Sequence, residues 1–257
     1  HYEWNEGGKR TSFADLLWRV HEEVPHLPRL RFITSYPRDF TDDALDVMAA
    51  APRICKYLHI PAQSGSNTIL RKMNRGYTVE QYLSLLERAR SRMPNIRLAG
   101  DMIVGFPGET EEDHQASIDL LRQARYKSCF IFKYSPRPGT ISIRRLEDDI
   151  PDAVKKARNV ELLDIQSQIS LELHQAYAGQ ELQVLVEGES RLRPKAPQPG
   201  EVRLGWVKPR SDMTRLIGRT EGDEIVAFTG SRSLIGSMTT VRATGATNLT
   251  IQGELVT

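Results

Sequence analysis

The chain has 257 residues, 39% of them hydrophobic and 26% charged, and its formal net charge is +2. These values are typical of a globular protein of one or two domains and exclude a wholly disordered chain, and the near-neutral charge does not by itself predict a nucleic-acid partner. No apolar run approaches the ~18 residues of a membrane span, and the first residues are polar, so we expect a cytoplasmic protein without a membrane partner.

Residues 1–177 show apolar runs that alternate with amphipathic helical patterns. Four runs are predicted to be strands covered on both faces: Leu30–Thr34, Tyr57–Ile60, Leu98–Val104 and Ser128–Tyr134. Capping signals at Thr78 and Thr110 predict helices between them. Strand and helix in alternation indicate parallel β/α units. Four strands are too few to close a barrel, so we expect an incomplete (β/α) barrel whose first strand has an unpaired edge.

A long helix is predicted from Pro151 to about Tyr177, because apolar residues recur there at intervals of three and four. The pattern changes at Gly179, after which short apolar runs are separated by Gly, Asp and Asn. These runs predict a small antiparallel β-barrel of roughly 80 residues. We therefore expect two domains, residues 1–177 and residues 178–257.

Polar, glycine-containing segments follow or end three successive predicted strands. They read AQSGSN, GDMIVGFPGET and KYSPRPGT. In a single loop, Gly and Pro are usually turn residues. Ligands of parallel β/α proteins bind at the carboxyl ends of the strands, so three such loops together predict a binding site at that end of the sheet.

Asp101 is unusual because it lies inside the apolar run LAGDMIVG, where a carboxylate needs a partner or a ligand. One alternative is a buried salt bridge with Arg75. Another is a shared polar site, since an Asp and an Arg facing one cavity suit a zwitterionic ligand. Glu109 is either a site residue or the beginning of the following helix.

Four segments resemble the radical SAM methylthiotransferases: LHIPAQSGSN, MNRGYT, GDMIVGFPGETEED and FKYSPRPGT. The most similar branch is that of the tRNA-2-methylthio-N(6)-dimethylallyladenosine synthases, and LIGRTEGDEIVAF resembles their TRAM domain. The resemblance implies an α/β fold, with an incomplete radical SAM (β/α) barrel followed by a small, RNA-binding TRAM-like β-barrel. It also implies a transferase that adds a methylthio group to carbon 2 of N(6)-isopentenyladenosine next to the anticodon of tRNA.

The resemblance further implies S-adenosylmethionine and two 4Fe-4S clusters as cofactors, an electron donor such as flavodoxin or ferredoxin, and a monomer. The residues that match its S-adenosylmethionine contacts are Gln63, Arg75 and Asp101, with Ser64 and Ser66 as weaker candidates. The family's cluster cysteines are absent, since the chain has two cysteines and no CxxxCxxC. We therefore expect the C-terminal part of a longer enzyme, without catalytic or metal-binding residues of its own and inactive alone.

The second predicted domain contains a basic segment. Between residues 191 and 219 the sequence contains eight Lys or Arg and two acidic residues, and this excess of positive charge is suited to phosphate contact. The candidate RNA contacts are Arg191, Arg193, Lys195, Trp206, Lys208, Arg210, Arg215 and Arg219, and Trp206 is suited to stack on a base. Arg137 is a further candidate for a phosphate contact. The alternative is a solvated loop whose Trp206 packs on its own barrel.

Two other functions fit the same sequence. One is a cluster-free RNA-binding protein, and the other is a sister methylthiotransferase that acts on threonylcarbamoyl-adenosine in tRNA. The presence of Gln63, Arg75 and Asp101 together favours an enzyme, because a pure RNA-binding protein needs no S-adenosylmethionine pocket. The identity of the modified nucleoside separates the two enzymes.

Overall fold

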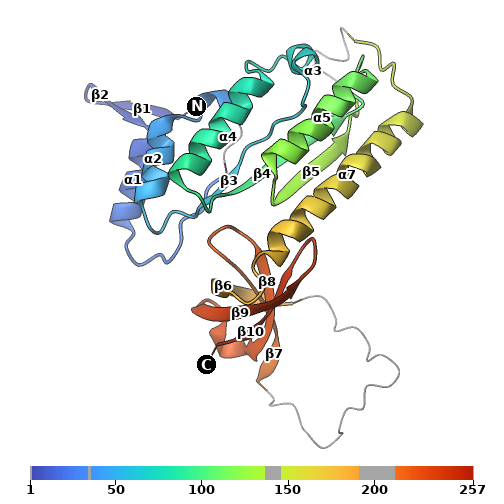
Figure 1. Cartoon of the computed structure of the whole chain (residues 1–257). Helices are drawn as coiled ribbons and strands as arrows, with labels where there is room; N and C mark the ends of the chain where they lie inside the picture. Colours follow the sequence, from blue (N-terminus) through green and yellow to red (C-terminus); the bar gives the residue numbers. More distant parts are fainter. Residues whose placement is uncertain (1, 34–35, 137–145, 191–211, 257) are drawn as a thin grey trace, which may run out of the picture. The chain divides into compact units, whose positions relative to one another are not determined.

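The computed structural model describes residues 2–33, 36–136, 146–190 and 212–256. The chain divides into two compact units, residues 1–170 and residues 171–257, which are described separately (Figure 1). The long helix α7 (Asp152–Gln175) contributes to both units. Among the described helices, none combines the length and the apolar character that a membrane span requires.

A parallel three-stranded sheet in the order β3-β4-β5 is the centre of the first unit. Its strands are β3 (Tyr57–His59), β4 (Arg97–Val104) and β5 (Ser128–Lys133). Three of the four predicted strands are thereby confirmed to within one residue at either end. The carboxyl ends of these strands carry the polar segments on which the predicted site depends.

The strand predicted at residues 30–34 is wrong over its described part. Leu30 forms an isolated parallel bridge with Ile54, and the next residues belong to no strand. The reason lies in side-chain packing, because the ring of Phe32 is engaged by Phe13 at 5.3 Å and by Phe40 at 6.4 Å between centroids. An aromatic cluster therefore holds this segment where the apolar run predicted a sheet ladder.

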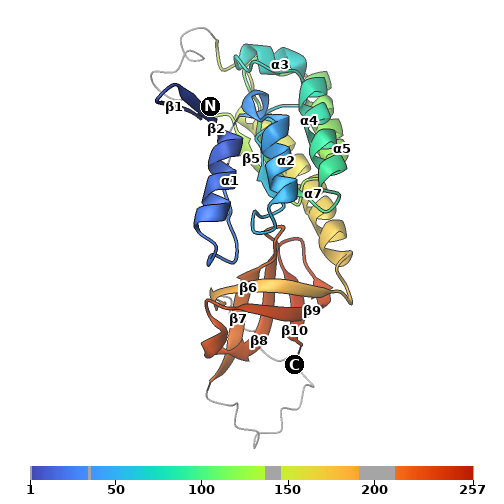
Figure 2. The same cartoon turned by 90° about the vertical axis from the view of Figure 1, so that its left-hand side faces the viewer.

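Helices cover one face of the sheet. The helices α4 (Val79–Arg92), α5 (Glu111–Ala124) and α7 lie on the same side of the strands in both views (Figures 1 and 2). The expectation that both faces are covered is wrong for β5, because Phe130 and Phe132 are 56% and 53% exposed. The sheet thus has one packed face and one open face.

The remaining elements of this unit precede β3 or lie between β3 and α4. They are the hairpin β1 (Glu3–Glu6) and β2 (Lys9–Ser12), then α1 (Phe13–Glu23), the 3-10 helix η1 (Pro37–Asp39), α2 (Asp42–Ala50) and α3 (Asn67–Lys72). The capping pattern predicted at Thr78 is confirmed: its side chain accepts the N–H of Gln81, and the Gln81 side chain accepts the N–H of Thr78. A reciprocal pair of this kind satisfies two helix N–H groups that would otherwise lack partners.

The second unit contains a closed five-stranded barrel in the order β10-β8-β7-β6-β9. The strands are β6 (Glu181–Glu189), β7 (Met213–Arg219), β8 (Ile225–Ser231), β9 (Met238–Ala246) and β10 (Ile251–Leu255). The predicted small barrel is confirmed, although it is not wholly antiparallel, because β8 and β10 pair in parallel. A 3-10 helix, η2 (Arg232–Leu234), lies between β8 and β9.

We expect a fragment of residues 171–257 to unfold in one cooperative thermal transition, because its barrel is closed and encloses its own core. Phe228 in that core is 1% exposed, so Phe228→Ala should lower the free energy of unfolding by about 3–5 kcal/mol. Leu249→Ala, at a side chain that is 71% exposed, should change it by less than ~0.5 kcal/mol. A gradual transition of the unsubstituted fragment, measured by circular dichroism, would contradict this expectation.

Candidate functional site

The chain after β3 leaves β4 and pairs with it again at Gln63. His59 is opposite Ala99, whereas Gln63 bridges to Met102, so the β3 side holds one extra residue. Gln63 accordingly has a φ of 72°, a left-handed conformation that non-glycine residues rarely adopt. Its N–H donates to the carbonyl of Asp101 at 2.8 Å. Its side-chain amide makes no hydrogen bond with any residue that the structure describes, so this amide is free to meet a ligand.

The carboxylate of Asp101 is paired with His59. Nε2 of His59 lies 2.9 Å from Oδ1 of Asp101, and the two side chains are 15% and 26% exposed. They come from the adjacent strands β3 and β4 and point to the open face of the sheet. The alternative salt bridge between Asp101 and Arg75 is not found in the described part of the chain. Sequence reasoning missed His59, although an Asp inside a strand indicated that a partner was needed.

Arg75 is brought to the same end of the sheet by Tyr77. The Tyr77 hydroxyl donates to the carbonyl of Ala62 at 3.0 Å, next to Gln63, so it ties the segment that carries Arg75 to the loop after β3. Burial raises the pKa of Tyr77 to about 12, and the Arg75 guanidinium acts in the opposite direction. Nε of Arg75 is buried and has no hydrogen-bond partner among the described residues.

Ser64 and Ser66 hydrogen-bond within the loop that they belong to. The Ser64 hydroxyl accepts the N–H of Ser66 at 3.1 Å. The Ser66 hydroxyl caps α3 by accepting the N–H groups of Thr68 and Ile69, and it donates to Asp113 of α5 at 2.5 Å. These contacts give both serines a structural role, and the S-adenosylmethionine contact of Ser64 stays a prediction.

Gly65 fixes the same loop against α5. Its N–H donates to the hydroxyl of Ser117 at 3.0 Å, and a Cβ at this position would collide with the carbonyl of Ala116. Only glycine permits so close an approach of the loop to the helix backbone. The polar sequence QSGSN therefore serves first to hold the loop and to begin α3.

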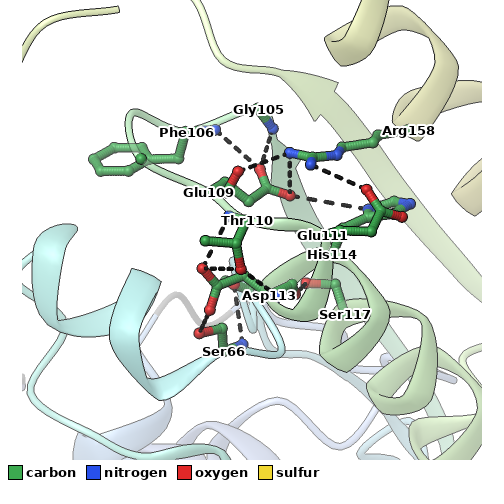
Figure 3. A network of polar contacts seen from close by, with 12 residues as sticks. Ser66, Gly105, Phe106, Glu109, Thr110, Glu111, Asp113, His114, Ser117 and Arg158 are labelled. Atoms are coloured by element: carbon green, nitrogen blue, oxygen red, sulfur yellow. Dashed lines mark hydrogen bonds and ion pairs between the residues drawn. The ribbon is translucent and has the colours of Figure 1, made fainter. Parts of the chain in front are cut away.

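The loop after β4 is organised by the buried carboxylate of Glu109 (Figure 3). This carboxylate accepts the N–H of Gly105 and, at 3.1 Å, the N–H of Phe106. Nη1 of Arg158, from α7, donates to the Glu109 carbonyl at 3.1 Å and lies 3.7 Å from its carboxylate. Burial raises the pKa of Glu109, against the lowering effects of Arg158 and the two N–H groups. Since Thr110 is the N-cap of α5, Glu109 precedes the helix and holds the loop.

Further contacts join α5 to α7 around this carboxylate. Nε2 of His114 lies 2.9 Å from Glu161, and its Nδ1 lies 3.9 Å from Glu109. Nη2 of Arg158 donates to Glu111 at 3.2 Å (Figure 3). The first turn of α5, the second and third turns of α7 and the loop after β4 thus form one polar network. Sequence reasoning missed Arg158 and His114, which lie in ordinary amphipathic helical patterns.

Two glycines in the GFPG loop adopt conformations that other residues avoid. Gly105 and Gly108 have φ of 70° and 72°. The side chain of Lys155 occupies the space of a Gly105 Cβ. Gly108 donates its N–H to Asp149 at 2.7 Å, and its carbonyl accepts from Nζ of Lys72 at 3.0 Å. The loop that follows Asp101 is consequently held from both sides.

Of the candidate RNA contacts, the structure describes Arg215 and Arg219. Arg219 is half-buried and paired with Glu187 at 3.1 Å and Asp223 at 3.0 Å. Burial alone would lower the pKa of Arg219, but these carboxylates outweigh it and raise the pKa. Arg215 donates to the side chain of Gln252. The other candidates lie outside the described residues: Arg137, Arg191, Arg193, Lys195, Trp206, Lys208 and Arg210.

Comparison with known proteins finds a family match in the first half of the chain. Residues 7–121 match the family model of the radical SAM superfamily. Coproporphyrinogen III oxidase (HemN) from Escherichia coli aligns with a TM-score of 0.45 and 22% identity over 55% of this chain and 32% of its own. The radical S-adenosylmethionine methyltransferase TsrM from Kitasatospora setae aligns with a TM-score of 0.39 and 22% identity over 46% and 23%.

A more particular similarity extends over nearly the whole chain. It is 42% identical over 247 residues to a protein from Carboxydothermus hydrogenoformans and 40% identical over 245 residues to one from Alkaliphilus oremlandii. Both are named tRNA-2-methylthio-N(6)-dimethylallyladenosine synthase. The alignments cover 96% and 95% of this chain, and 51% and 48% of those proteins. The resemblance predicted from the motifs is confirmed, and the chain spans about half the length of these curated relatives.

We expect Glu109 to leave a signature in the pH dependence of stability. Because its folded-state pKa is raised above the ordinary 4.5, the folded protein retains a proton that the unfolded chain has already released. The stability that this proton provides is present below the unfolded pKa and is lost as the pH rises towards the folded pKa. Urea unfolding should therefore show that wild type loses stability relative to Glu109→Gln as the pH rises above about 4.5.

Glu112→Gln is the matched control. Hydrogen bonds at the beginning of α5, first from the backbone N–H of Glu112 and then from Thr110, lower the pKa of the exposed Glu112. Its contribution is lost as the pH falls, so the difference between wild type and Glu112→Gln should change in the opposite direction. If the difference in unfolding free energy between wild type and Glu109→Gln stays constant across the pH range, the raised pKa of Glu109 is contradicted.

Proposed function

We propose that this chain is the S-adenosylmethionine-binding and RNA-binding part of a tRNA methylthiotransferase. The reaction is the addition of a methylthio group to carbon 2 of N(6)-isopentenyladenosine next to the anticodon. The observation that carries the proposal is the 42% identity, over 96% of the chain, to a protein named for this chemistry. Since the chain spans about half of that relative, the activity is proposed for a protein that includes it.

The residues at and after the end of β3, together with Asp101 in the middle of β4, fit S-adenosylmethionine. The Asp101 carboxylate is accessible on the open face and would accept hydrogen bonds from ribose hydroxyls or the amino group. The Gln63 amide has no partner among described residues, and Arg75 has an unpartnered Nε suited to a carboxylate. When bound, S-adenosylmethionine supplies this enzyme class with the 5′-deoxyadenosyl radical that removes hydrogen from carbon 2.

The two cysteines do not fit an iron–sulfur cluster. Cys55 is buried, and burial raises the pKa of the Cys129 thiol, with Asp101 adding to the effect. Cluster ligands are thiolates, which a raised pKa disfavours. Over the ranges that the structure describes, no group of three or more His, Cys, Asp or Glu is arranged to hold a metal ion. We therefore assign no cluster ligand to these 257 residues, although the radical SAM class implies such clusters.

The proposed partners are the anticodon stem-loop of tRNA and an electron donor such as flavodoxin or ferredoxin, for a cytoplasmic monomer. A TRAM-like role of the barrel in holding RNA is supported by the basic stretch between residues 191 and 219. A cluster-free RNA-binding protein is less favoured, because the polar groups around Asp101 have no use in it. An enzyme for threonylcarbamoyl-adenosine is less favoured, because the relatives above are named for dimethylallyladenosine.

We expect Asp101→Asn to weaken the binding of S-adenosylmethionine to this chain about tenfold, as loss of a charge-assisted hydrogen bond does. Isothermal titration calorimetry measures the dissociation constant. Asp119→Asn is the matched control, because the Asp119 carboxylate is 52% exposed on α5, away from the carboxyl ends of the strands. Equal affinities of wild type and Asp101→Asn would remove Asp101 from the site.

A chimera tests the reaction itself. These 257 residues would replace the aligned half of the Carboxydothermus hydrogenoformans relative, and the chimera would be expressed in cells that lack their own enzyme. Mass spectrometry of tRNA nucleosides should detect 2-methylthio-N(6)-isopentenyladenosine, and Asp101→Asn should reduce it at least tenfold. Methylthiolated threonylcarbamoyl-adenosine as the product would favour the sister enzyme. No methylthiolated nucleoside, with the chimera folded, would reject the proposal.

A further inference from the structure

The open face of the sheet carries an ordered row of aromatic rings. The ring centroids of His59 and Phe130 are 6.1 Å apart with planes inclined by 28°, and those of Phe130 and Phe132 are 6.4 Å apart at 15°. We call these three side chains, from β3 and β5, the aromatic row. The described structure leaves both phenylalanines more than half exposed. Ordered, exposed rings on a sheet are suited to stack on a planar ligand.

The face around the aromatic row has a polar and an apolar end. Phe130 is opposite Asp101 on β4, and Phe132 is opposite Ile103, so all four side chains are on one face. The Asp101–His59 pair marks the polar end and Phe132 with Ile103 the apolar end. A second layer of apolar protein would bury Asp101 at a cost in desolvation. A ligand that is planar, polar at one end and aliphatic at the other satisfies both ends.

We propose that the aromatic row binds the base to be modified, with the adenine ring stacked on Phe130 and the isopentenyl group along Phe132 and Ile103. This inference rests on the proposed function, which supplies a substrate with both a purine ring and a branched apolar tail. Base stacking on an aromatic side chain tolerates any base. Discrimination for the prenylated base therefore comes from the apolar end of the face.

The position of the aromatic row also fits the reaction. Asp101 is shared between this face and the proposed S-adenosylmethionine site, and Gln63 donates its N–H to the Asp101 carbonyl at 2.8 Å. A base stacked on Phe130 would thus adjoin the cofactor. Reactants held in adjoining sites react without the entropy cost of a chance encounter, which is the arrangement that hydrogen transfer between two bound molecules requires.

Titration of the 257-residue chain with two nucleosides, N(6)-isopentenyladenosine and adenosine, tests the proposal. Wild type should bind the prenylated nucleoside about tenfold more tightly, as burial of about two carbons of its tail on an open face predicts. Phe130→Leu should weaken both nucleosides about fivefold to thirtyfold, whereas Phe132→Leu should mainly reduce the preference between them. Trp4→Leu is the matched control, since Trp4 on the β1–β2 hairpin is also 56% exposed.

Equal affinities of wild type for the two nucleosides, or unchanged affinities in both phenylalanine variants, would overturn the inference. The chimera separates this failure from failure of the proposed function. If the chimera modifies tRNA and its KM for tRNA is unaffected by Phe130→Leu and Phe132→Leu, the function stands and the aromatic row is a surface covered by protein. If nucleoside preference depends on the row but S-adenosylmethionine does not bind, the row stands and the proposed function fails.

Discussion

The carboxylate of Glu109 holds the part of the molecule on which the candidate site depends. It occupies a buried position where it accepts two backbone N–H groups of the GFPG loop and lies near the guanidinium of Arg158. A buried loop must satisfy its backbone groups, and here one side chain does so for two of them. Arg158 extends the same interaction to α7. The loop after β4 therefore keeps one conformation, and the strand that precedes it presents Asp101 at a fixed place.

The packed and open faces of the sheet have different tasks. Helices α4, α5 and α7 bury one face, so the strands hold their positions without a second layer (Figure 2). The open face carries polar, aromatic and aliphatic side chains, and the Asp101–His59 pair is accessible enough to exchange its hydrogen bond for one to a ligand. The packed face therefore supplies rigidity, and the open face carries the residues of the candidate site. Sites on strands held in this way are more precise than sites on free loops.

The sequence predicted those features that local pattern determines. The runs of β3, β4 and β5 and the capping pattern at Thr78 were visible because apolar continuity and capping residues are local signals. The partner of Asp101 was not predictable, because it depends on the register of β3 against β4. The exposure of one face of β5 could not be predicted from the sequence. Phe130 and Phe132 alternate with the buried Ile131, so the strand is apolar on both faces. The strand predicted for Leu30–Thr34 is wrong over its described part, because Phe32 packs with other aromatic rings.

Charge pairing within the barrel makes its arginines unequally suited to phosphate contact. Each of the four arginines in residues 212–256 has a partner: Arg215 with Gln252, Arg219 with Glu187 and Asp223, Arg232 with Glu189, and Arg242 with Glu181. Exposed pairs such as the last two contribute little, so a phosphate can take over the guanidinium at small cost. The half-buried Arg219 would have to break its ion pairs with two carboxylates before it could bind a phosphate. Arg215, whose partner is a neutral amide, keeps an uncompensated charge, and phosphate contact within the described barrel is therefore easiest at its end of β7.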